Sequence, residues 1–459
     1  MPRVRPRELV SVIKTNDIRF LTIVSTLTRG GTERAAVNYA LGYRRAGFPS
    51  AVLAYNGGGP RRAQLEDAGV LVFAGGPDEA GTLRALEQAR AWNPDILQLN
   101  RPGQSDPASA SVLKFLIHPR LRVFETNVFS RADRSDDRVM IDLHLHLSRW
   151  CLWKWSQSVR GLQPQSPGAV VPYSVDCTAF DMVLPGECAA IRGAFGLPQD
   201  AVVYGRVGQP LTSKWSSVLI QAFEVVAKKL PNAWLAVCGM PDTLKGMVRD
   251  LPAGIRARVL ELPMTESDAE LRRYYGLMDV FVHLADRGES FGMVLCEAML
   301  SGRPVITMST PLRDNSQIEV VQHKKTGIVV QNLRQTIEAM LACKEDQAAY
   351  ESARRQAPIW VREQYDIPVV TQKLLAIARI ALAAASPQDM VRRLVELPGA
   401  IAEAPAGLYR DLLSSAGIKQ SWQDSVLTPL VNRPTSLLAI SLIRPSASRF
   451  TWNRKERIG

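Results

Sequence analysis

The feature that most constrains the fold is an alternation of short apolar segments with longer amphipathic ones, which occurs twice along the chain. In the first series, residues 19–25 (RFLTIVS) are short, apolar and β-branched, and residues 32–46 carry apolar side chains at helical spacing before Gly47. A second series of the same kind begins near Ala201. Strands that alternate with helices predict parallel sheets with helices on both faces, so we expect two doubly wound, Rossmann-like domains in an α/β chain.

The expected domain boundaries follow from where these series begin and end. A chain of 459 residues with 46% hydrophobic residues is too long for one such domain. We predict one Rossmann-like domain over residues 1–185 and a second over residues 186–360. Helical spacing continues from about residue 336, and residues 361–385 are predicted to be a helix that returns to the first domain. Residues 386–459, with scattered Pro and Gly, are predicted to be a helical extension of unknown role.

Charge and cysteine content narrow the class of partner. The net charge of +12 and the pI near 9.6 favour phosphate-bearing partners such as nucleotides, nucleic acid or an anionic membrane surface. No helix-turn-helix, zinc finger or RNP-like motif is visible, so we do not expect a nucleic-acid partner. The six cysteines are scattered without CxxC spacing, which argues against a disulfide framework and for the cytoplasm.

The sequence predicts neither a secretory signal nor a membrane-spanning helix. The opening segment MPRVRPRELVSVIK has basic residues but no apolar core, so it does not resemble a secretory signal. No apolar run is long enough to span a bilayer, which leaves peripheral association with the inner face of a membrane as the expected kind of membrane contact.

A glycine pair lies between the first predicted strand and the first predicted helix. Gly30 and Gly31 would let a ligand approach the backbone closely, and the start of the helix offers free N–H groups to an anion. The segment is not GxGxxG, so a standard dinucleotide site is not supported. A plain tight turn before a helix explains the pair equally well.

Two glutamates, Glu289 and Glu297, flank the start of another predicted helix. We expect Glu289 in the loop after the strand DVFVHLA, residues 290–294 at the start of the helix, and Glu297 further along it. A carboxylate can accept hydrogen bonds from two adjacent hydroxyls, and a helix start between two such groups would attract a phosphate. The alternative is that Glu289 caps the helix and Glu297 is a solvated helix residue.

Two cations follow the first strand of the second series. Arg206 and Lys214 are predicted to lie in the loop after that strand, where they could neutralise a departing pyrophosphate; a solvated loop is the alternative. His144 and His146 alternate on one predicted strand and so point the same way. No third metal ligand is evident near them, so we predict no metal site and assign them to a paired face or the surface.

Four of these segments, taken in order, resemble the retaining glycosyltransferases of the GT-B fold, the family also called group 1 or family 4. The resemblance covers about residues 18–385 and is carried by GGTERAAVNYALGYRRAGF from Gly30, VVPYSVD at residues 170–176, GRVG with Lys214, and ESFGMVLCEAMLSGRPVI from Glu289. It implies that the two domains face each other across a cleft, with the acceptor on the first domain and the nucleotide sugar on the second.

The resemblance also implies roles for individual residues. Arg206 and Lys214 would bind the diphosphate, Glu289 would hold hydroxyls of the donor sugar, and Glu297 would bind the ribose. Gly30 and Gly31 would let the first loop approach the diphosphate and the acceptor. The sugar and phosphates would face the backbone of one continuous segment: Ser290, Phe291, Gly292, Met293 and Val294.

Three positions depart from the family pattern. Members often have a histidine near the end of the strand around residues 123–127, where this chain has none, and Glu125 or Asn127 are the candidates to take its place. Tyr173 stands where members usually have asparagine, and the spacing from Arg206 to Lys214 is longer than is common.

The function implied is that of a retaining, hexosyltransferase-like enzyme that uses neither metal nor cofactor. It would move a sugar from a nucleotide-sugar donor to a glycan or lipid-linked acceptor in the synthesis of cell-surface polysaccharide or glycoconjugates. The departing phosphate can take the acceptor's proton, so no dedicated base is required. The alternatives are a non-catalytic protein on the same fold that binds sugar nucleotides or glycans, which the missing histidine favours, and a nucleotide-sugar epimerase.

Overall fold

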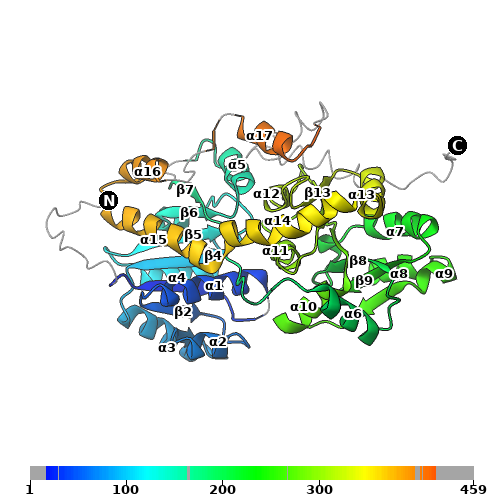
Figure 1. Cartoon of the computed structure of the whole chain (residues 1–459). Helices are drawn as coiled ribbons and strands as arrows, with labels where there is room; N and C mark the ends of the chain where they lie inside the picture. Colours follow the sequence, from blue (N-terminus) through cyan, green and yellow to red (C-terminus); the bar gives the residue numbers. More distant parts are fainter. Residues whose placement is uncertain are drawn as a thin grey trace.

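Two parallel β-sheets form the two halves of the molecule (Figure 1). The computed structural model describes residues 17–28, 30–162, 166–265, 267–397, 404–405 and 407–419. The expectation of two Rossmann-like domains is confirmed, and the described residues after 386 are helical as expected; the rest of the predicted extension over residues 386–459 lies outside the described residues.

The first domain contains a seven-stranded sheet in the order β3-β2-β1-β4-β5-β6-β7. Its strands are β1 (Phe20–Val24), β2 (Ser50–Ala54), β3 (Leu71–Ala74), β4 (Ile96–Arg101), β5 (Arg122–Asn127), β6 (Leu143–His146) and β7 (Gly168–Val170). Its helices are α1 (Gly31–Arg45), α2 (Arg62–Asp67), α3 (Glu79–Ala91), α4 (Pro107–Leu116), the 3-10 helix η1 (Asp136–Met140) and α5 (Arg149–Ser158). All residues of β1 are buried because helices cover both faces of this central strand.

The second domain contains a six-stranded sheet in the order β10-β9-β8-β11-β12-β13. Its strands are β8 (Val202–Val207), β9 (Ala233–Cys238), β10 (Val259–Leu262), β11 (Val280–His283), β12 (Val305–Met308) and β13 (Gly327–Val330). Its helices are α6 (Pro185–Ala194), the 3-10 helix η2 (Thr212–Lys214), α7 (Val218–Lys229), α8 (Asp242–Arg249), α9 (Ala253–Arg256), α10 (Asp268–Leu277), α11 (Met293–Leu300), α12 (Gln317–Val320) and α13 (Leu333–Glu345).

The strand order locates the expected ligand crevice in each sheet. In the first sheet the chain proceeds in one direction from β1 to β3 and in the other from β4 to β7, and the second sheet reverses in the same way between β8 and β11. Doubly wound sheets bind ligands at such reversals, beyond the carboxyl ends of the strands. The glycine pair follows β1, Arg206 belongs to β8, and Glu289 follows β11. The predicted site residues therefore lie at these two reversals.

Two boundaries differ from the sequence prediction in ways that affect the site. The helix expected to begin at Ser290 begins at Met293, because Gly292 has a φ of 94° and left-handed backbone cannot continue a helix. Gly205 and Arg206 lie inside β8 and not in the loop after it. The continuous helical pattern predicted from about residue 336 is divided into separate helices.

Two long helices cross between the domains (Figure 1). α14 (Gln347–Tyr365) packs on α11 and α15 (Ile367–Ala383) packs on α1 of the first domain. α15 approaches α1 closely because Gly42 has no side chain; a Cβ there would lie 2.1 Å from Oγ1 of Thr371. Between the two helices, Tyr365 O accepts a 2.8 Å hydrogen bond from Val175 N in the other crossing segment, so the two interdomain connections lie side by side.

The C-terminal helices pack on both domains. α16 (Pro387–Glu396) packs on α15, and α17 (Leu408–Ser415) packs on α5 and α12. Apolar residues of α17 form a cluster with Trp150 and Trp153 of α5 and with Ile318 of α12. α17 therefore covers a place where the two domains meet.

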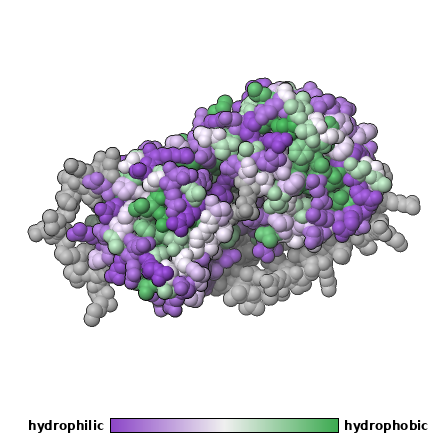
Figure 2. Space-filling model, turned by 90° about the horizontal axis from the view of Figure 1, so that it is seen from below, coloured by the Kyte–Doolittle hydropathy of each residue, from purple (hydrophilic) through white to green (hydrophobic). Residues whose placement is uncertain are grey.

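The surface seen from below is mainly hydrophilic, with small hydrophobic patches on both halves of the molecule (Figure 2). Within the described part of the chain, no helix is long and apolar enough to cross a membrane.

Candidate functional site

The carboxylate of Glu289 lies at the centre of a charged cluster beyond the end of β11. Lys214 Nζ donates a 2.7 Å hydrogen bond to its Oε2, and His283 Nε2 lies 3.2 Å from its Oε1. Burial alone would raise the pKa of Glu289, but the charge of Lys214 and the contact with His283 outweigh it and lower the pKa to about 2. The group is therefore an anion at neutral pH and a strong acceptor for hydroxyls.

His283, at the end of β11, was assigned no functional role from the sequence. Burial, and then the charge of Arg206, lower its pKa to about 4, so the imidazole is neutral at pH 7. A neutral ring that donates its Nε2–H to Glu289 orients that carboxylate without adding charge. Its position six residues before Glu289, on the strand that leads to the loop, was the signal for this role.

Lys214 supplies the positive charge at this position. It ends the short 3-10 helix η2, and its side chain is 35% exposed. An ammonium group has three donors, and the structure uses one of them on Glu289. The remaining donors can bind a second anion, such as a phosphate, beside the glutamate.

Arg206 lies beneath the loop that carries Lys214. It is 1% exposed, donates to the carbonyl oxygens of Val207 and Lys214 (2.7 Å to the latter), and lies 5.0 Å over the ring of Trp215. Burial lowers its pKa to about 10, which leaves it charged at neutral pH. In this conformation Arg206 positions Lys214, and direct contact with a diphosphate stays a prediction.

Glu297 is buried in α11 and has partners from both domains. Tyr275 donates a 2.9 Å hydrogen bond to its Oε2, and Arg34 Nη1 donates a 3.0 Å bond to its Oε1. Arg34 belongs to α1 of the first domain and also pairs with Asp268 at 2.9 Å. Burial raises the pKa of Glu297, and the charge of Arg34 opposes that shift. The alternative of a solvated Glu297 is therefore wrong.

The first loop lies against the start of α11. Gly30 is the N-cap of α1, and a Cβ on Gly31 would lie 3.4 Å from Cε of Met293. The structure thus brings the glycine pair and the Glu289–Val294 segment together across the domain interface. Arg29, which precedes the pair, lies outside the described residues.

The segment between the two glutamates has a buried side chain, Phe291, and backbone N–H groups, at the start of α11, that can face a ligand. The ring of Phe291 is buried between Tyr173, at 5.7 Å, and Tyr365, at 5.1 Å. Tyr173, one of the departures from the family pattern, therefore packs against this loop. Gly292 has no side chain that could cap α11, so the first N–H groups of that helix, at Met293 and Val294, can face an anion.

Glu125 and Asn127 have structural partners in the first domain. Glu125 is fully buried, pairs with Arg101 and accepts a 2.6 Å hydrogen bond from His144 Nδ1. Asn127 exchanges hydrogen bonds of 2.8 and 3.0 Å with the backbone of Arg131. Both side chains are buried and bonded within the first domain. The prediction that one of them takes the place of the family histidine therefore gains no support from these contacts.

The two strand histidines are not on the surface. His144 and His146 are buried, and both rings contact Trp155, with centroids 4.9 and 4.7 Å away. In the described residues no group of three or more His, Cys, Asp or Glu side chains is arranged to hold a metal ion.

Known proteins resemble this chain in sequence and in fold. Residues 189–359 match the family described as glycosyl transferases group 1. D-inositol 3-phosphate glycosyltransferase of Mycobacterium bovis is 34% identical over 201 residues, which are 41% of this chain and 36% of that protein. The enzyme of the same name from Mycolicibacterium smegmatis is 34% identical over 135 residues, or 28% and 29% of the two chains. The chain thus matches only about a third of the length of these relatives.

Solved structures resemble the fold over a larger part of the chain. A glycosyltransferase from Rickettsia africae superimposes with a TM-score of 0.66 at 15% identity and covers 80% of this chain and 99% of its own. Anabaena HepE, solved in complex with UDP and glucose, gives 0.62 at 18% identity over 78% and 98% of the two chains. The two facing Rossmann-like domains are therefore a GT-B fold. The segment that matches the group 1 glycosyl transferases, residues 189–359, carries Arg206, Lys214, Glu289 and Glu297.

Proposed function

We propose that this protein is a retaining glycosyltransferase that moves a sugar from a nucleotide-sugar donor to a glycan or lipid-linked acceptor. The observation that carries the proposal is the cluster of Lys214, Glu289 and His283 beyond the reversal point of the second sheet. It pairs a permanent carboxylate, suited to sugar hydroxyls, with a cation suited to a phosphate. The named activity of the curated relatives and the UDP and glucose bound to Anabaena HepE support a nucleotide-sugar donor.

In the proposed reaction the bond between the anomeric carbon and the diphosphate oxygen breaks first. Negative charge builds on the leaving phosphate, where Lys214 and the start of α11 stabilise it. Glu289 holds the hydroxyls of the donor sugar. The acceptor hydroxyl then forms its bond to the anomeric carbon on the face that the phosphate leaves, and the departing phosphate takes the proton.

This scheme needs no metal, no cofactor and no separate base. Lys214 and the N–H groups of α11 provide the positive charge that a metal supplies elsewhere. Glu125, whose carboxylate is bonded to Arg101 and His144, is not required as a base. We place the reaction in the cytoplasm, where the net charge of +12 would favour a lipid-linked acceptor at an anionic membrane surface in polysaccharide or glycoconjugate synthesis.

The test combines donor binding with turnover. Thermal shifts of the purified chain with UDP-, GDP- and ADP-sugars identify the donor, and release of free sugar from that donor measures basal activity. Lys214→Ala should lower turnover by about 100- to 1,000-fold, the cost of removing one group that stabilises the leaving charge. Lys228→Ala, which removes an exposed surface cation, serves as the control.

Two results would contradict the proposal. Near-normal turnover in both Lys214→Ala and Glu289→Gln would contradict the roles assigned to these two side chains. Binding of a donor without any turnover, in every acceptor mixture, would favour the non-catalytic binding protein.

A further inference from the structure

The first turn of α5 in the first domain is capped by a side chain of the second domain. The N–H groups of a helix's first turn have no partners inside the helix. In α5, Cys151 N donates a 3.0 Å hydrogen bond to Oγ of Ser148, the residue before the helix. Glu319 of α12 accepts two more, from Arg149 N at 3.2 Å and from Trp150 N at 2.7 Å. Side-chain caps usually come from a neighbour in sequence, whereas Glu319 is 170 positions from Arg149.

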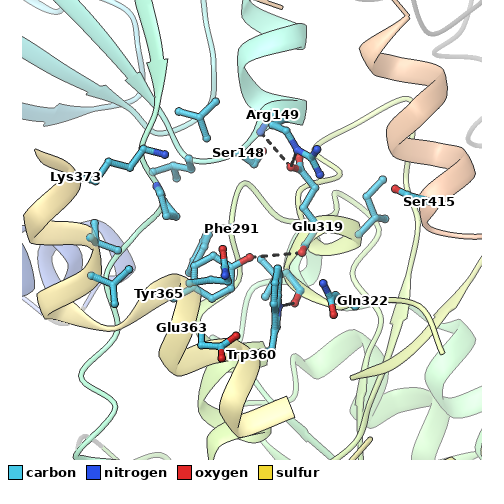
Figure 3. A pocket seen from close by; sticks show the side chains of 18 of the residues that line it. Ser148, Arg149, Phe291, Glu319, Gln322, Trp360, Glu363, Tyr365, Lys373 and Ser415 are labelled. Atoms are coloured by element: carbon cyan, nitrogen blue, oxygen red, sulfur yellow. Dashed lines mark hydrogen bonds and ion pairs between the residues drawn. The ribbon is translucent and has the colours of Figure 1, made fainter. Parts of the chain in front are cut away.

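The carboxylate of Glu319 is well suited to this position. It also accepts a 2.9 Å hydrogen bond from Arg149 Nε, and Figure 3 shows the two side chains meeting at the N-terminal end of α5. A negative charge is favourable there, because the N–H groups of a helix start carry a partial positive charge. The side chain of Glu319 is only 11% exposed, so water competes little for these bonds. Glu319 therefore joins the second domain to the first.

The segment that carries Glu319 also holds the backbone of Glu289. Ser316 N donates a 2.9 Å hydrogen bond to the carbonyl oxygen of Glu289. Oε1 of Gln317 accepts a 3.0 Å bond from the N–H of Glu289. Two consecutive residues at the start of α12 thus fix both backbone groups of Glu289. The direction in which its carboxylate points toward Lys214 depends on this backbone position.

The first turn of α5 also contacts the residues next to Glu289. Oγ of Ser148 lies 2.7 Å from Oγ of Ser316, and Sγ of Cys151 lies 3.3 Å from the same oxygen. The thiol of Cys151 donates to the carbonyl oxygen of Ser290 at 3.5 Å. All four side chains are buried. Because coupling is carried by such continuous packed contacts, a displacement of α5 against α12 would reach Glu289.

Tyr365 of α14 connects the same two segments. Its hydroxyl donates a 3.5 Å hydrogen bond to the carbonyl oxygen of Glu319, and its ring contacts that of Phe291 with centroids 5.1 Å apart. Glu319, Phe291 and Tyr365 border the same cavity (Figure 3). The position of Glu319 and that of the Glu289–Val294 segment therefore depend on each other.

We propose that Glu319 is a positioning residue for the donor site. Its cap on α5 fixes Ser316 and Gln317, and these two residues direct the carboxylate of Glu289 to the hydroxyls of the donor sugar. The inference rests on the proposed function, because that function assigns Glu289 to the sugar. Affinity for the sugar then depends on a contact between the two domains, although Glu319 acts only through Glu289.

The effect of Glu319 should be confined to the sugar part of the donor. Lys214, the proposed phosphate partner, is positioned by Arg206, which donates a 2.7 Å hydrogen bond to its carbonyl oxygen. That contact involves neither α5 nor α12. Loss of the cap should therefore weaken a nucleotide sugar and spare a nucleoside diphosphate, whereas a general loosening of the fold would weaken both.

Calorimetric titration of the full chain tests the proposal with two probes. The first is UDP-, GDP- or ADP-glucose, whichever stabilises the chain most in thermal shifts, and the second is the matching nucleoside diphosphate. Glu319→Ala should weaken the sugar nucleotide about tenfold, or about 1.4 kcal/mol, within the usual cost of a lost cap, and the diphosphate less than about twofold. Glu319→Gln keeps one oxygen that can accept from an N–H group, so its loss should be smaller, about threefold.

A double-mutant cycle shows whether Glu319 acts through Glu289. In a Glu289→Gln chain, Glu319→Ala should cause no further loss of affinity for the sugar nucleotide. Lys154→Ala is the matched control, because it removes another bond between the domains on this side, to Asp314. It should leave the ratio of the two affinities unchanged. Thermal melting shows which variants fold, and Glu319→Gln replaces Glu319→Ala throughout if the alanine variant does not.

The outcomes separate this proposal from the proposed function. Equal weakening of both probes by Glu319→Ala, additive losses in the cycle, or an equal change of the ratio in Lys154→Ala would overturn the positioning role. Each of these results leaves the donor role of Glu289 intact, provided that Glu289→Gln weakens the sugar nucleotide. If Glu289→Gln leaves that affinity unchanged, or if none of the three sugar nucleotides binds, the proposed function fails and this inference fails with it.

Discussion

Substitution of Arg34 by alanine should reveal how strongly the two domains are joined on the cleft side. Arg34 reaches from α1 to Glu297 in α11, and the two side chains are 13% and 4% exposed. Loss of one partner of a buried ion pair costs about 3–5 kcal/mol, because the other charge stays buried. Glu297 retains its bond from Tyr275, so we expect the lower end, about 3 kcal/mol at pH 8.

The loss should depend on pH with a definite sign. Burial already raises the pKa of Glu297, and removal of the Arg34 charge, which opposes that shift, would raise it further. A carboxyl whose folded pKa lies above its unfolded value of about 4.3 makes the folded state bind more protons, so stability falls as pH rises through that window. Each additional unit by which the pKa of Glu297 rises corresponds to about 1.4 kcal/mol in the free energy of unfolding. The stability that Arg34→Ala loses should therefore be smaller at pH 5.5 than at pH 8.

The assay is a double-mutant cycle of Arg34→Ala and Glu297→Gln, followed by urea unfolding at both pH values. We expect a coupling of about 2 kcal/mol at pH 8 and less at pH 5.5. Arg62→Ala, which removes an exposed partner of Glu66, should cost no more than about 0.5 kcal/mol at either pH. A coupling below ~0.5 kcal/mol at pH 8, or a deficit equal at both pH values, would refute the reasoning.

Three further predictions concern stability. Glu125→Ala should cost about 3–5 kcal/mol in thermal or urea unfolding, because Arg101 would remain buried with one carboxylate fewer. Burial alone would raise the pKa values of Glu125 and Glu289, but their bonded partners lower both to about 2. The contribution of these two carboxylates to the free energy of unfolding is therefore complete above pH ~4.3 and should be lost as the pH falls toward 2. Acid unfolding followed by circular dichroism would measure this loss. Leu412→Ala in α17 should cost about 2–5 kcal/mol and shift tryptophan fluorescence to the red by loosening the cover over Trp150; an unchanged spectrum and midpoint would contradict this.

The alternation of segments was sufficient to predict both sheets because it reports burial directly. β1 and β8 are buried along their whole length, and helices on both faces require such strands. Strand order was not predictable, since it depends on contacts between segments distant in the sequence. The boundary of β8 was misplaced because Gly205 and Gly208 indicated a loop, whereas β8 continues through Arg206.

The candidate site was predictable only in part. Motif spacing located the glutamates and Lys214, but not what they contact. Arg34 and Glu297 are 263 positions apart and in different domains, so their bond depends on how the domains meet. Arg206 had the expected residue type for phosphate, and only the structure shows its guanidinium bonded to the carbonyl of Lys214.

The contacts of the proposed donor groups lead to one inference about how a substrate enters. Lys214 and Glu289 are bonded to each other, and Glu297 is bonded to Arg34, so hydroxyls and phosphates of a donor must replace or share these bonds. The bonds of Arg34 join the domains on the cleft side, and the opposite side is joined by Lys154 with Asp314 and is covered by α17. We infer that the domains separate about the paired crossings near Val175 and close again on the donor. In small-angle scattering, the Arg34→Ala variant should then have a smaller radius of gyration with the donor bound than without it. A radius of gyration that the donor leaves unchanged would reject this motion.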